Sequence, residues 1–567
     1  MKTDVRVFCA NTSTHYDVPM GSTLKELSDQ VCREAAAGLP VLAALVDNKL
    51  KSLDFKLVNP HDVRFIGYDH PDGRRTYIRS LCFVLQKVVH EMFPEKTLAI
   101  DYSLPSGLYC ELRERCSMED GRPQVYFVTD ADLETIQQRM TEIISADLPF
   151  TKTVLPHDEA LSLFEANSQW EKARLLTSLG RFSYNVYWLD GLADKFYGPL
   201  VPRTGCLTTF ALAGFNDGFI LQYPMDGNPG KVLPMKRQSK IATALKEHSD
   251  WCAVMGVTGV GTLNRKVLSG EIVDLINLSE ALHERKYAEI ADQIYARRGS
   301  VKIVFIAGPS SSGKTSTSKR LALQCRILGL NPKVIELDNY FVNRELTPRD
   351  ESGEYDFEAL GAMDLKFLGQ QLNELLEGKE VEIPRFDFKE GRRYFNGDWM
   401  QLREKDILIM EGIHALNPAM IPGVDSSKVF RVYASALTSL SIDENNNIST
   451  SDNRMLRRMI RDNRTRGIVP EDTIMRWQSV RRGENRNIFP YQENADALFN
   501  SAHIFELPVL KYYAEPLLRR IAPSSPAYTE ATRLLKFLDY IVALSPSEIA
   551  AIPPTSILRE FIAGQTL

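Results

Sequence analysis

Eight residues in the second half of the chain, Gly308 to Thr315, have the spacing of a phosphate-binding loop. They read GPSSSGKT and match the pattern GxxxxGK followed by Ser or Thr. In such a loop small residues let backbone N–H groups approach phosphate oxygens, and the N-terminus of the next helix adds positive potential. Lys314 is predicted to reach the β- and γ-phosphate oxygens, and Thr315 to offer a hydroxyl to Mg²⁺. The spacing therefore indicates a nucleoside triphosphate site.

The class of nucleotide enzyme and the metal ligands depend on residues farther along the chain. A GTPase would show an NKxD-type guanine-reading motif downstream, and none occurs after residue 315. The apolar stretch DILIMEG contains Glu411 at its end, and this carboxylate is predicted to bind Mg²⁺ together with Thr315. The alternative for Glu411 is a loop cap. The predicted nucleotide contacts are Gly308, Ser310, Ser311, Ser312, Gly313, Lys314, Thr315 and Ser316.

A carboxylate suited to general-base chemistry, Asp338, lies at the end of the apolar stretch KVIELD. Ligands of open parallel sheets bind at the carboxyl ends of the strands. Asp338 is therefore predicted to accept the proton of a hydroxyl nucleophile, a role typically worth ~10²–10⁴ in rate. A second Mg²⁺ ligand or a turn former is the alternative. Charged loops downstream, with Asp356, Asp387 and Arg393, suit a polyhydroxylated, sugar-like acceptor.

Residues 454–486 form an arginine-rich stretch. It holds ten arginines, no lysine and four acids, a local charge of +6 in a chain of net −5. Arginine binds phosphate oxygens in pairs of hydrogen bonds, so Arg461 and Arg466 are predicted to stabilise a phosphoryl group in transfer from a mobile lid helix. A solvated basic face is the alternative for most of these arginines, and an RNA-binding patch is a second one.

The elements that must position these residues begin near residue 300, where strands and helices start to alternate. VKIVFIAG, residues 301–308, is a nearly continuous apolar run, as expected for a central parallel strand buried on both faces. Further strands are predicted at 333–338, 406–412, 428–434 and 503–507, with helical stretches between them. The pattern indicates an α/β fold with a parallel sheet and helices on both faces.

The front of the chain predicts additional units. Residues 1–68 combine strand-like stretches, one of them at 55–58, with an amphipathic helix and suggest a β-grasp module. Residues 69–220 read as an α+β unit and 221–299 as a connecting region that ends in a linker helix. Residues 300–567 then comprise the α/β domain and a C-terminal helical extension.

The composition is that of an ordinary globular protein. Of 567 residues, 44% are hydrophobic and 25% charged, and 68 basic against 73 acidic side chains give the net charge of −5. This leaves no global electrostatic case for nucleic acid, and no apolar run approaches the ~18 residues of a membrane span. The start, MKTDVRVFCANTS, lacks the pattern of a secretory signal, and the eight cysteines form no CxxC pair. Reduced thiols in a cytoplasmic protein are expected, and a homo-oligomer is left open.

Six motifs together resemble the uridine kinase and phosphoribulokinase family of P-loop kinases over about residues 300–510. They are GPSSSGKTS, LDNYF, YDFEALGAMD, IPRFDF, ILIMEGIHAL and RRMIRDNRTRG. The resemblance implies Mg²⁺- and ATP-dependent phosphorylation of a sugar hydroxyl, with Asp338 as the catalytic aspartate. It also implies that Asp356 holds ribose hydroxyls and that Arg458, Arg461 and Arg466 are lid arginines.

The acceptor site departs from the pattern of uridine kinases. After the Ile-Pro pair those enzymes carry a tyrosine and then a histidine that read the pyrimidine, whereas this chain has Phe386 and Gly391. The expected acceptor is the 5′-hydroxyl of a nucleoside whose base is left open. Another small alcohol or a sugar phosphate is the alternative, and so is an RNA-binding regulatory ATPase. The predicted acceptor contacts are Asp356, Phe386, Arg393 and Arg458.

The front half resembles the N-terminal half of threonyl-tRNA synthetase, with residues 1–68 similar to its TGS module and 69–220 to its second additional domain. In the frames RSLCF and FYGPLVPRTG, the HxxxH and CxxxH patterns of the editing site become Arg79 with Phe83 and Phe196 with Leu200. Neither metal binding nor hydrolytic editing is expected from these side chains. The resemblance implies RNA contact through the front domains. No catalytic synthetase core follows in the sequence, so aminoacylation is not expected. The whole order of domains is similar to that of multidomain bacterial proteins labelled uridine or nucleoside kinases.

Overall fold

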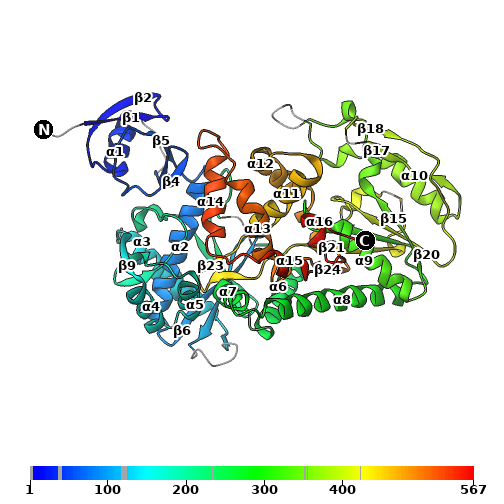
Figure 1. Cartoon of the computed structure of the whole chain (residues 1–567), viewed down its shortest axis with the longest axis horizontal. Helices are drawn as coiled ribbons and strands as arrows, with labels where there is room; N and C mark the ends of the chain where they lie inside the picture. The colour runs from blue at the N-terminus through cyan, green and yellow to red at the C-terminus, as the bar shows by residue number, and fades with distance from the viewer. Residues whose placement is uncertain are drawn as a thin grey trace.

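The computed structural model describes residues 4–35, 41–115, 124–232, 235, 236, 238–349, 353, 355–387, 389–421 and 423–567 (Figure 1). The chain runs from a small front unit through a second α+β unit and three connecting helices into an α/β part. In the view of Figure 1 the chain starts at the left edge of the molecule and ends within the α/β part on the right.

The front unit is a five-stranded mixed sheet with one helix packed against it. The strand order is β2-β1-β5-β3-β4, in which β1 and β5 run parallel. Alternate residues of β1 are buried, so Val5 and Val7 face Leu24 and Leu27 of α1 in one apolar core. Its elements are β1 Asp4–Cys9, β2 Thr14–Pro19, α1 Leu24–Ala35, β3 Ala43–Val46, β4 Lys49–Lys51 and β5 Asp62–Ile66.

The strand predicted at 55–58 is wrong. Only Lys56 pairs there, in an isolated bridge with Thr23. Leu57 is buried from a loop, and its backbone bonds to the turn that precedes α1 at Ser22 and Gly21. Apolar residues in this stretch therefore mark a loop that closes the core, because burial by itself does not require a strand ladder.

The second unit contains a five-stranded antiparallel sheet, β12-β13-β7-β6 with β8 beside β7, and a three-stranded sheet, β11-β10-β9. Its long helix α2 begins with Pro71, where a missing N–H costs nothing, and His70 Nδ1 accepts the Asp72 N–H at 3.2 Å. The elements are α2 Pro71–Met92, β6 Lys96–Leu104, β7 Gly107–Glu114, β8 Val125–Tyr126, α3 Asp130–Ser145, β9 Thr151–Pro156, α4 His157–Ala166, α5 Trp170–Leu179, β10 Ser183–Leu189, β11 Leu192–Asp194, β12 Ala211–Phe215 and β13 Gly218–Gln222.

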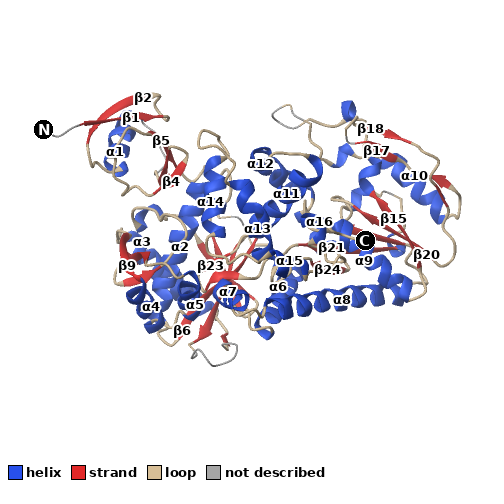
Figure 2. Ribbon diagram, viewed as in Figure 1, coloured by secondary structure: helices blue, strands red, loops and turns tan. Residues whose placement is uncertain are grey.

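Three helices, α6 Ser239–Val254, α7 Val260–Leu268 and α8 Ile272–Ala296, connect this unit to the α/β part. The expected linker helix is α8, which runs along the lower edge of the right half of the molecule in Figure 2. Tyr287, Ile290 and Ile294 of α8 pack into the core beside the parallel sheet. No described helix is long and apolar enough to cross a membrane.

The α/β part is built on a five-stranded sheet in the order β15-β20-β14-β21-β24, and every neighbouring pair is parallel. The predicted parallel sheet is therefore confirmed, and all five residues of its central strand β14 are buried, as the apolar run indicates. Helices surround the sheet (Figure 2). The strands are β14 Ile303–Ala307, β15 Asn331–Glu336, β20 Asp406–Glu411, β21 Val429–Ser435 and β24 Ala497–Asn500.

The strand predicted at 503–507 is wrong, since the fifth strand is β24 and helix α13 begins at Glu506. A short buried apolar run does not distinguish a strand from the start of a buried helix. The helices are α9 Lys314–Ile327, α10 Leu365–Leu376, α11 Thr450–Arg466, α12 Pro470–Asn487, α13 Glu506–Leu518, α14 Tyr528–Leu538, α15 Pro546–Ala550 and α16 Arg559–Ile562. Short hairpins pair β16 Val381–Glu382 with β19 Trp399–Met400, β17 Arg385–Asp387 with β18 Arg392–Tyr394, and β22 Ser441–Asp443 with β23 Asn446–Asn447.

The hairpin β22–β23 joins the α/β part to the second unit. The Ile100 N–H donates to the Glu444 carbonyl at 2.8 Å, and Asn445 Nδ2 donates to the Leu98 carbonyl at 3.0 Å. The buried Lys172 ammonium contacts the Asp194 carboxylate and lies 3.9 Å from Asp443. The two parts of the chain therefore share a buried polar interface.

Candidate active site

The predicted phosphate loop connects β14 to α9. At two of its positions, Gly308 and Gly313, the structure favours glycine over any other residue. A Cβ on Gly308 would lie 2.0 Å from the Ala434 carbonyl oxygen. Gly313 has a φ of +78°, and a Cβ there would lie 2.4 Å from Ile557 Cδ1. A side chain at Gly308 would displace the loop, because real Cβ atoms do not approach a backbone carbonyl so closely. At Gly313 the contact is with the end of a flexible side chain, and the left-handed φ is what favours glycine there.

The serines of the loop fit an anionic ligand. Ser311 has a φ of +58°, a conformation that turns successive N–H groups toward one side, as in anion-binding nests. The Ser311 and Ser312 hydroxyl oxygens are buried and have no hydrogen-bond partner among the described residues. Buried hydroxyls are rarely left without partners, so these two are available to a phosphate group.

Thr315 and Glu411 are brought together as the sequence predicts. Thr315 Oγ1 donates to Glu411 Oε1 at 2.6 Å. Glu411 ends β20, in register with Ile306 of β14 and Glu336 of β15. Burial raises the pKa of the Glu411 carboxyl to about 7, and the nearby Lys314 opposes this shift. A cation next to both oxygens would complete the arrangement.

A metal ion at this place would need ligands from a bound nucleotide. Among the described residues, no group of three or more His, Cys, Asp or Glu side chains is arranged to hold a metal ion. Mg²⁺ commonly binds through one or two protein oxygens together with substrate phosphates and water. Thr315 and Glu411 fit that mode of binding.

Asp338 lies in a 3₁₀ turn, Leu337–Tyr340, directly after β15. Burial raises the pKa of its carboxyl, and the positive charges of Lys314 and Arg466 act in the opposite direction. Asp338 therefore lies within electrostatic reach of the phosphate loop and of the end of α11. This is the place in which an acceptor hydroxyl would meet the triphosphate.

The predicted acceptor residues divide into two groups. Phe386 lies beside the turn that holds Asp338: its N–H donates to Asn339 Oδ1 at 3.3 Å, and its ring centroid is 5.7 Å from that of Phe341. Arg393 is engaged elsewhere, since Nη2 donates to Asp364 Oδ2 at 2.8 Å. As a ligand of the acceptor, Arg393 stays a prediction.

Gly391 is explained by close packing. Its φ is +71°, and a Cβ there would lie 2.7 Å from Arg344 Nε. Arg344 also donates its N–H to the Gly391 carbonyl at 2.8 Å. A histidine at this position would collide with Arg344, so the departure from the uridine kinase pattern is built into the hairpin.

Glu358 is a carboxylate that sequence reasoning missed. Burial and the neighbouring Glu484 raise the pKa of its carboxyl to about 7, opposed by Arg458 and Lys314. Asp356, predicted to bind the acceptor, accepts the Glu358 N–H at 3.1 Å. The only signal in the sequence is the spacing of acids in EYDFE, which does not say which of them faces the site.

The three predicted lid arginines of α11 contact the phosphate loop or one buried carboxylate, Asp462. Arg458 Nη1 donates to Ser310 Oγ at 2.9 Å. Arg461 Nε donates to Asp462 Oδ1 at 2.9 Å, and Arg466 Nη1 lies 3.5 Å from the same oxygen. Asp462 is 1% exposed. Because Arg458, Arg461 and Arg466 all pair with this one carboxylate, they lie on one side of the helix.

Two further arginines of α11 are interior residues. Arg454 is 1% exposed and Arg457 is 0% exposed. Arg454 pairs with Glu484 and donates from Nε to the Ser310 carbonyl at 3.0 Å, while Arg457 pairs with Glu506. The alternatives of a solvated basic face and an RNA patch are therefore wrong for these two residues. They support the phosphate loop from inside the protein.

The C-terminal segment also contacts the loop, which the sequence did not indicate. Glu560 Oε2 accepts the Ser316 hydroxyl at 2.5 Å and the Ser316 N–H at 3.3 Å. Gln565 Nε2 donates to Ser316 Oγ at 2.7 Å. Lys319 Nζ donates to the Leu567 carbonyl oxygen at 3.0 Å. The partners in these hydrogen bonds are about 250 residues apart in the chain, so no local sequence pattern predicts the contacts.

A comparison with known protein families identifies the domain that contains these residues. The model of the phosphoribulokinase/uridine kinase family matches residues 303–506. These residues form a domain of that family. This kinase domain contains the phosphate loop, Glu411 and Asp338. It also contains the arginines of α11. The predicted family membership and fold class are thus confirmed.

Among solved structures, the chain is similar to a possible uridine kinase from Bacillus stearothermophilus, with 18% identity, a TM-score of 0.24 and coverage of 35% of this chain and 89% of that chain. It is also similar to D-glycerate 3-kinase from Cryptococcus neoformans var. grubii serotype A, with 14% identity and a TM-score of 0.20, over 49% of this chain and 87% of that chain.

The N-terminal part is homologous to threonyl-tRNA synthetase. The threonine–tRNA ligase of Desulforamulus reducens is 29% identical over 189 residues, 33% of this chain and 27% of the ligase. That of Francisella tularensis subsp. holarctica is 26% identical over 171 residues, 30% of this chain and 25% of the ligase. The chain thus spans about a quarter of the length of these curated relatives.

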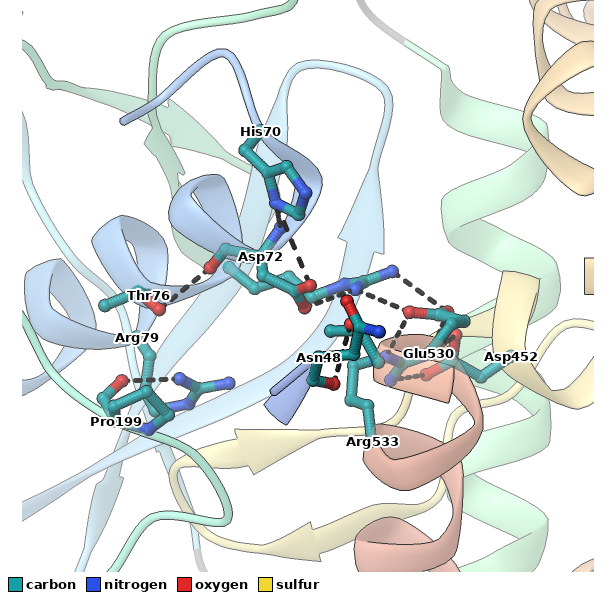
Figure 3. Close-up of polar contacts among 11 residues, drawn as sticks. Asn48, His70, Asp72, Thr76, Arg79, Pro199, Asp452, Glu530 and Arg533 are labelled. Atoms are coloured by element: carbon teal, nitrogen blue, oxygen red, sulfur yellow. Dashed lines mark hydrogen bonds and ion pairs between the residues drawn. The ribbon is translucent and has the colours of Figure 1, made fainter. Parts of the chain in front are cut away.

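The four positions at which the editing pattern is replaced are packed together. Phe83 and Leu200 are buried, and the Phe83 ring meets the Phe196 ring edge-on with centroids 5.2 Å apart. Arg79 Nη1 donates to the Pro199 carbonyl at 2.7 Å (Figure 3). These side chains fill the frame with apolar groups and one bonded guanidinium.

Proposed function

We propose that the protein is an ATP- and Mg²⁺-dependent kinase that phosphorylates the hydroxyl of a small substrate, with the 5′-hydroxyl of a nucleoside as the favoured acceptor. The observation that carries the proposal is the meeting of three neighbouring strand ends. There β14 leads into the phosphate loop, β20 ends at Glu411 bonded to Thr315, and β15 leads into Asp338. Ligands of parallel sheets bind at this edge.

The residues of the chain divide the chemistry between them. ATP would supply the phosphoryl group, and Mg²⁺ would neutralise charge on its oxygens. Lys314 would bind the β- and γ-phosphate oxygens, and Thr315 and Glu411 would hold the metal. Asp338 accepts the proton of the acceptor hydroxyl as its oxygen bonds to phosphorus and the bond to the β-phosphate breaks. Arg461 and Arg466 offset the charge on the group in transfer.

The acceptor is the finer part of the proposal. Phe386 and Gly391 offer a base no side-chain hydrogen bond, so recognition rests on stacking against Phe386 and Phe341 and on Asp356 for ribose hydroxyls. The same lack of polar side chains favours the alternative acceptor, another small alcohol or a sugar phosphate. The third hypothesis, an RNA-binding regulatory ATPase, loses support because Arg454 and Arg457 are interior.

A screen of ADP release with Mg·ATP tests the proposal. The panel contains purine and pyrimidine nucleosides, simple sugars and sugar phosphates, with the Asp338→Asn protein as the blank. Release that depends on a nucleoside supports the favoured acceptor, and release that depends on a sugar or sugar phosphate supports the alternative. Release that no acceptor stimulates would contradict the kinase assignment.

We also propose a cytoplasmic location. The six cysteines whose side chains the structure describes are free, and five of them are buried. Free buried thiols are typical of reducing compartments. Measurement of the cysteine redox state by thiol alkylation in cell extracts would test this, and a stable disulfide would contradict it.

A further inference from the structure

A cavity of about 340 Å³ lies where three separate parts of the chain meet. The front unit contributes Lys51, the second unit contributes Lys152 and Arg181, and helix α14 contributes Lys536. Tyr187 and Tyr540 are among the aromatic lining residues. None of the residues assigned to the kinase site lines this cavity, so it is a separate feature of the molecule.

The cavity holds more positive than negative charge. Four cationic side chains line it, against one carboxylate, Asp539. The Arg181–Asp539 pair is loose at 4.0 Å. Lys152 lies 3.8 Å from Asp54, which is 59% exposed. Pairs this long between exposed groups contribute little.

Two of the lysines have no carboxylate in contact. Among the described residues, no ion pair within 4.0 Å is formed by Lys51 or by Lys536. Burial lowers the pKa of Lys51, and Lys49 and Lys152 lower it further. Burial also lowers the pKa of Lys536, and Lys51 and Arg79 add to the effect. The lysines therefore repel one another, and an anion between them would remove this cost.

The walls of the cavity are fixed in place. Arg79 bonds to Pro199, and its guanidinium lies 4.9 Å from the centre of the Tyr197 ring, which orders the segment that forms one wall. Helix α14 is fixed by Glu530, which accepts Arg75 Nη1 at 2.8 Å, and by Arg533, which donates to Asp452 at 2.7 and 2.8 Å (Figure 3). The wall at residues 197–199 and the helix that carries Lys536 are thus fixed before any ligand binds.

We propose that this cavity binds a small molecule that carries two or more phosphate groups. Four converging cations match a multiply charged anion, and lysine is a common point-charge partner of phosphate. The volume lies at the lower end of the range of small-molecule sites, and the aromatic wall offers a surface for an apolar or planar part of the ligand.

The test uses the full chain with Lys314→Ala, so that the phosphate loop no longer dominates anion binding. Inorganic tripolyphosphate without Mg²⁺ is the probe, and calorimetric titration at low salt measures its affinity. We expect one site, and an affinity at least about tenfold weaker when Lys51→Gln and Lys536→Gln are added, because each lysine supplies a charge-assisted hydrogen bond. Lys49→Gln, on the same strand but not lining the cavity, is expected to change the affinity less than threefold.

Thermal unfolding with and without tripolyphosphate is a second measurement. It distinguishes lysines that bind the anion from lysines that only support the fold. Without anion, the Lys51→Gln and Lys536→Gln proteins are expected to be at least as stable as the parent, because a repulsion has been removed. Tripolyphosphate is expected to raise the Tm of the parent and not of the double variant. Equal affinity in parent and double variant would overturn the proposal. So would binding of a short RNA oligonucleotide but of neither tripolyphosphate nor ATP.

Discussion

The Glu560 carboxylate and Ser316 form a double contact at the start of the helix that follows the phosphate loop. One oxygen, Oε2, accepts both the Ser316 hydroxyl and the Ser316 N–H. Ser316 is one of the residues predicted to contact ATP, and backbone N–H groups of such loops bind phosphate oxygens. A carboxylate from the C-terminal segment thus holds a donor that the sequence assigns to the nucleotide.

Removal of this negative charge is expected to strengthen nucleotide binding. In Glu560→Gln the side-chain oxygen still accepts from Ser316, while the repulsion between the carboxylate and the triphosphate disappears. Interactions between charges near the protein surface are worth about 0.5 kcal/mol. We therefore expect the Kd for ATP to fall about threefold, with little change in Tm. Fluorescence titration measures the Kd, and Glu289→Gln, whose side chain is 44% exposed on α8, is the matched control. An unchanged or higher Kd would show that the contact only supports the helix.

Loss of the proposed base is expected to stop turnover without loss of nucleotide. Asp338→Asn keeps the shape of the side chain but cannot accept the hydroxyl proton. Turnover should fall at least ~10²-fold while the Kd for ATP stays within about twofold. Asp292→Asn, at an exposed position of α8, is the control and should retain full turnover. Near-normal turnover in Asp338→Asn would refute the assignment.

The buried ion pair between Arg457 and Glu506 is expected to be essential for stability. Arg457→Met leaves the Glu506 carboxylate buried without its partner, and such a change costs about 3–5 kcal/mol. The Tm should fall clearly, and nucleotide binding should weaken as well, because Arg457 Nη1 also donates to the Ser311 carbonyl at 3.4 Å. Arg285→Met, whose side chain is 71% exposed, should leave the Tm nearly unchanged. Similar Tm values for the two variants would contradict the interior role.

The interface carboxylate Glu444 is expected to make stability depend on pH. Burial raises the pKa of its carboxyl to about 8 from an ordinary 4.5. Lys172 opposes this shift, and Asp443 and Glu171 add to it. Below pH 4.5 the group is protonated in both states and has no effect. As the pH rises from 4.5 to 8 only the unfolded state ionises freely, so the folded protein loses stability.

Glu444→Gln removes that titration and isolates its effect. The variant should gain about 2 °C or more in Tm relative to the parent at pH 8.5, and much less at pH 5. Glu142→Gln, an exposed acid in α3, should show the same difference from the parent at both pH values. A constant difference for Glu444→Gln as well would mean that the carboxyl is ionised throughout.

Local patterns were sufficient for the parts of the site that the chain builds from consecutive residues. Gly308, Gly313 and Lys314 belong to one strand, turn and helix, and their spacing predicts their geometry. The sequence pattern did not locate the fifth strand correctly. The apolar residues 503–507 lead into a buried helix, and the strand, β24, lies just before them. The acceptor loop is intermediate: the sequence named Asp356, and the fold adds Glu358 beside it.

The sequence by itself determined the phosphate loop, the parallel sheet and the carboxylate after β15, since each depends on residues near one another in the chain. The tertiary structure decided which charges meet. Arg454 and Arg457 are interior because Glu484 and Glu506 come from other helices, and Glu560 reaches Ser316 across 244 residues. Electrostatic and hydrogen-bonding partners are selected by proximity in space, and the order of residues does not encode that proximity in any local spacing.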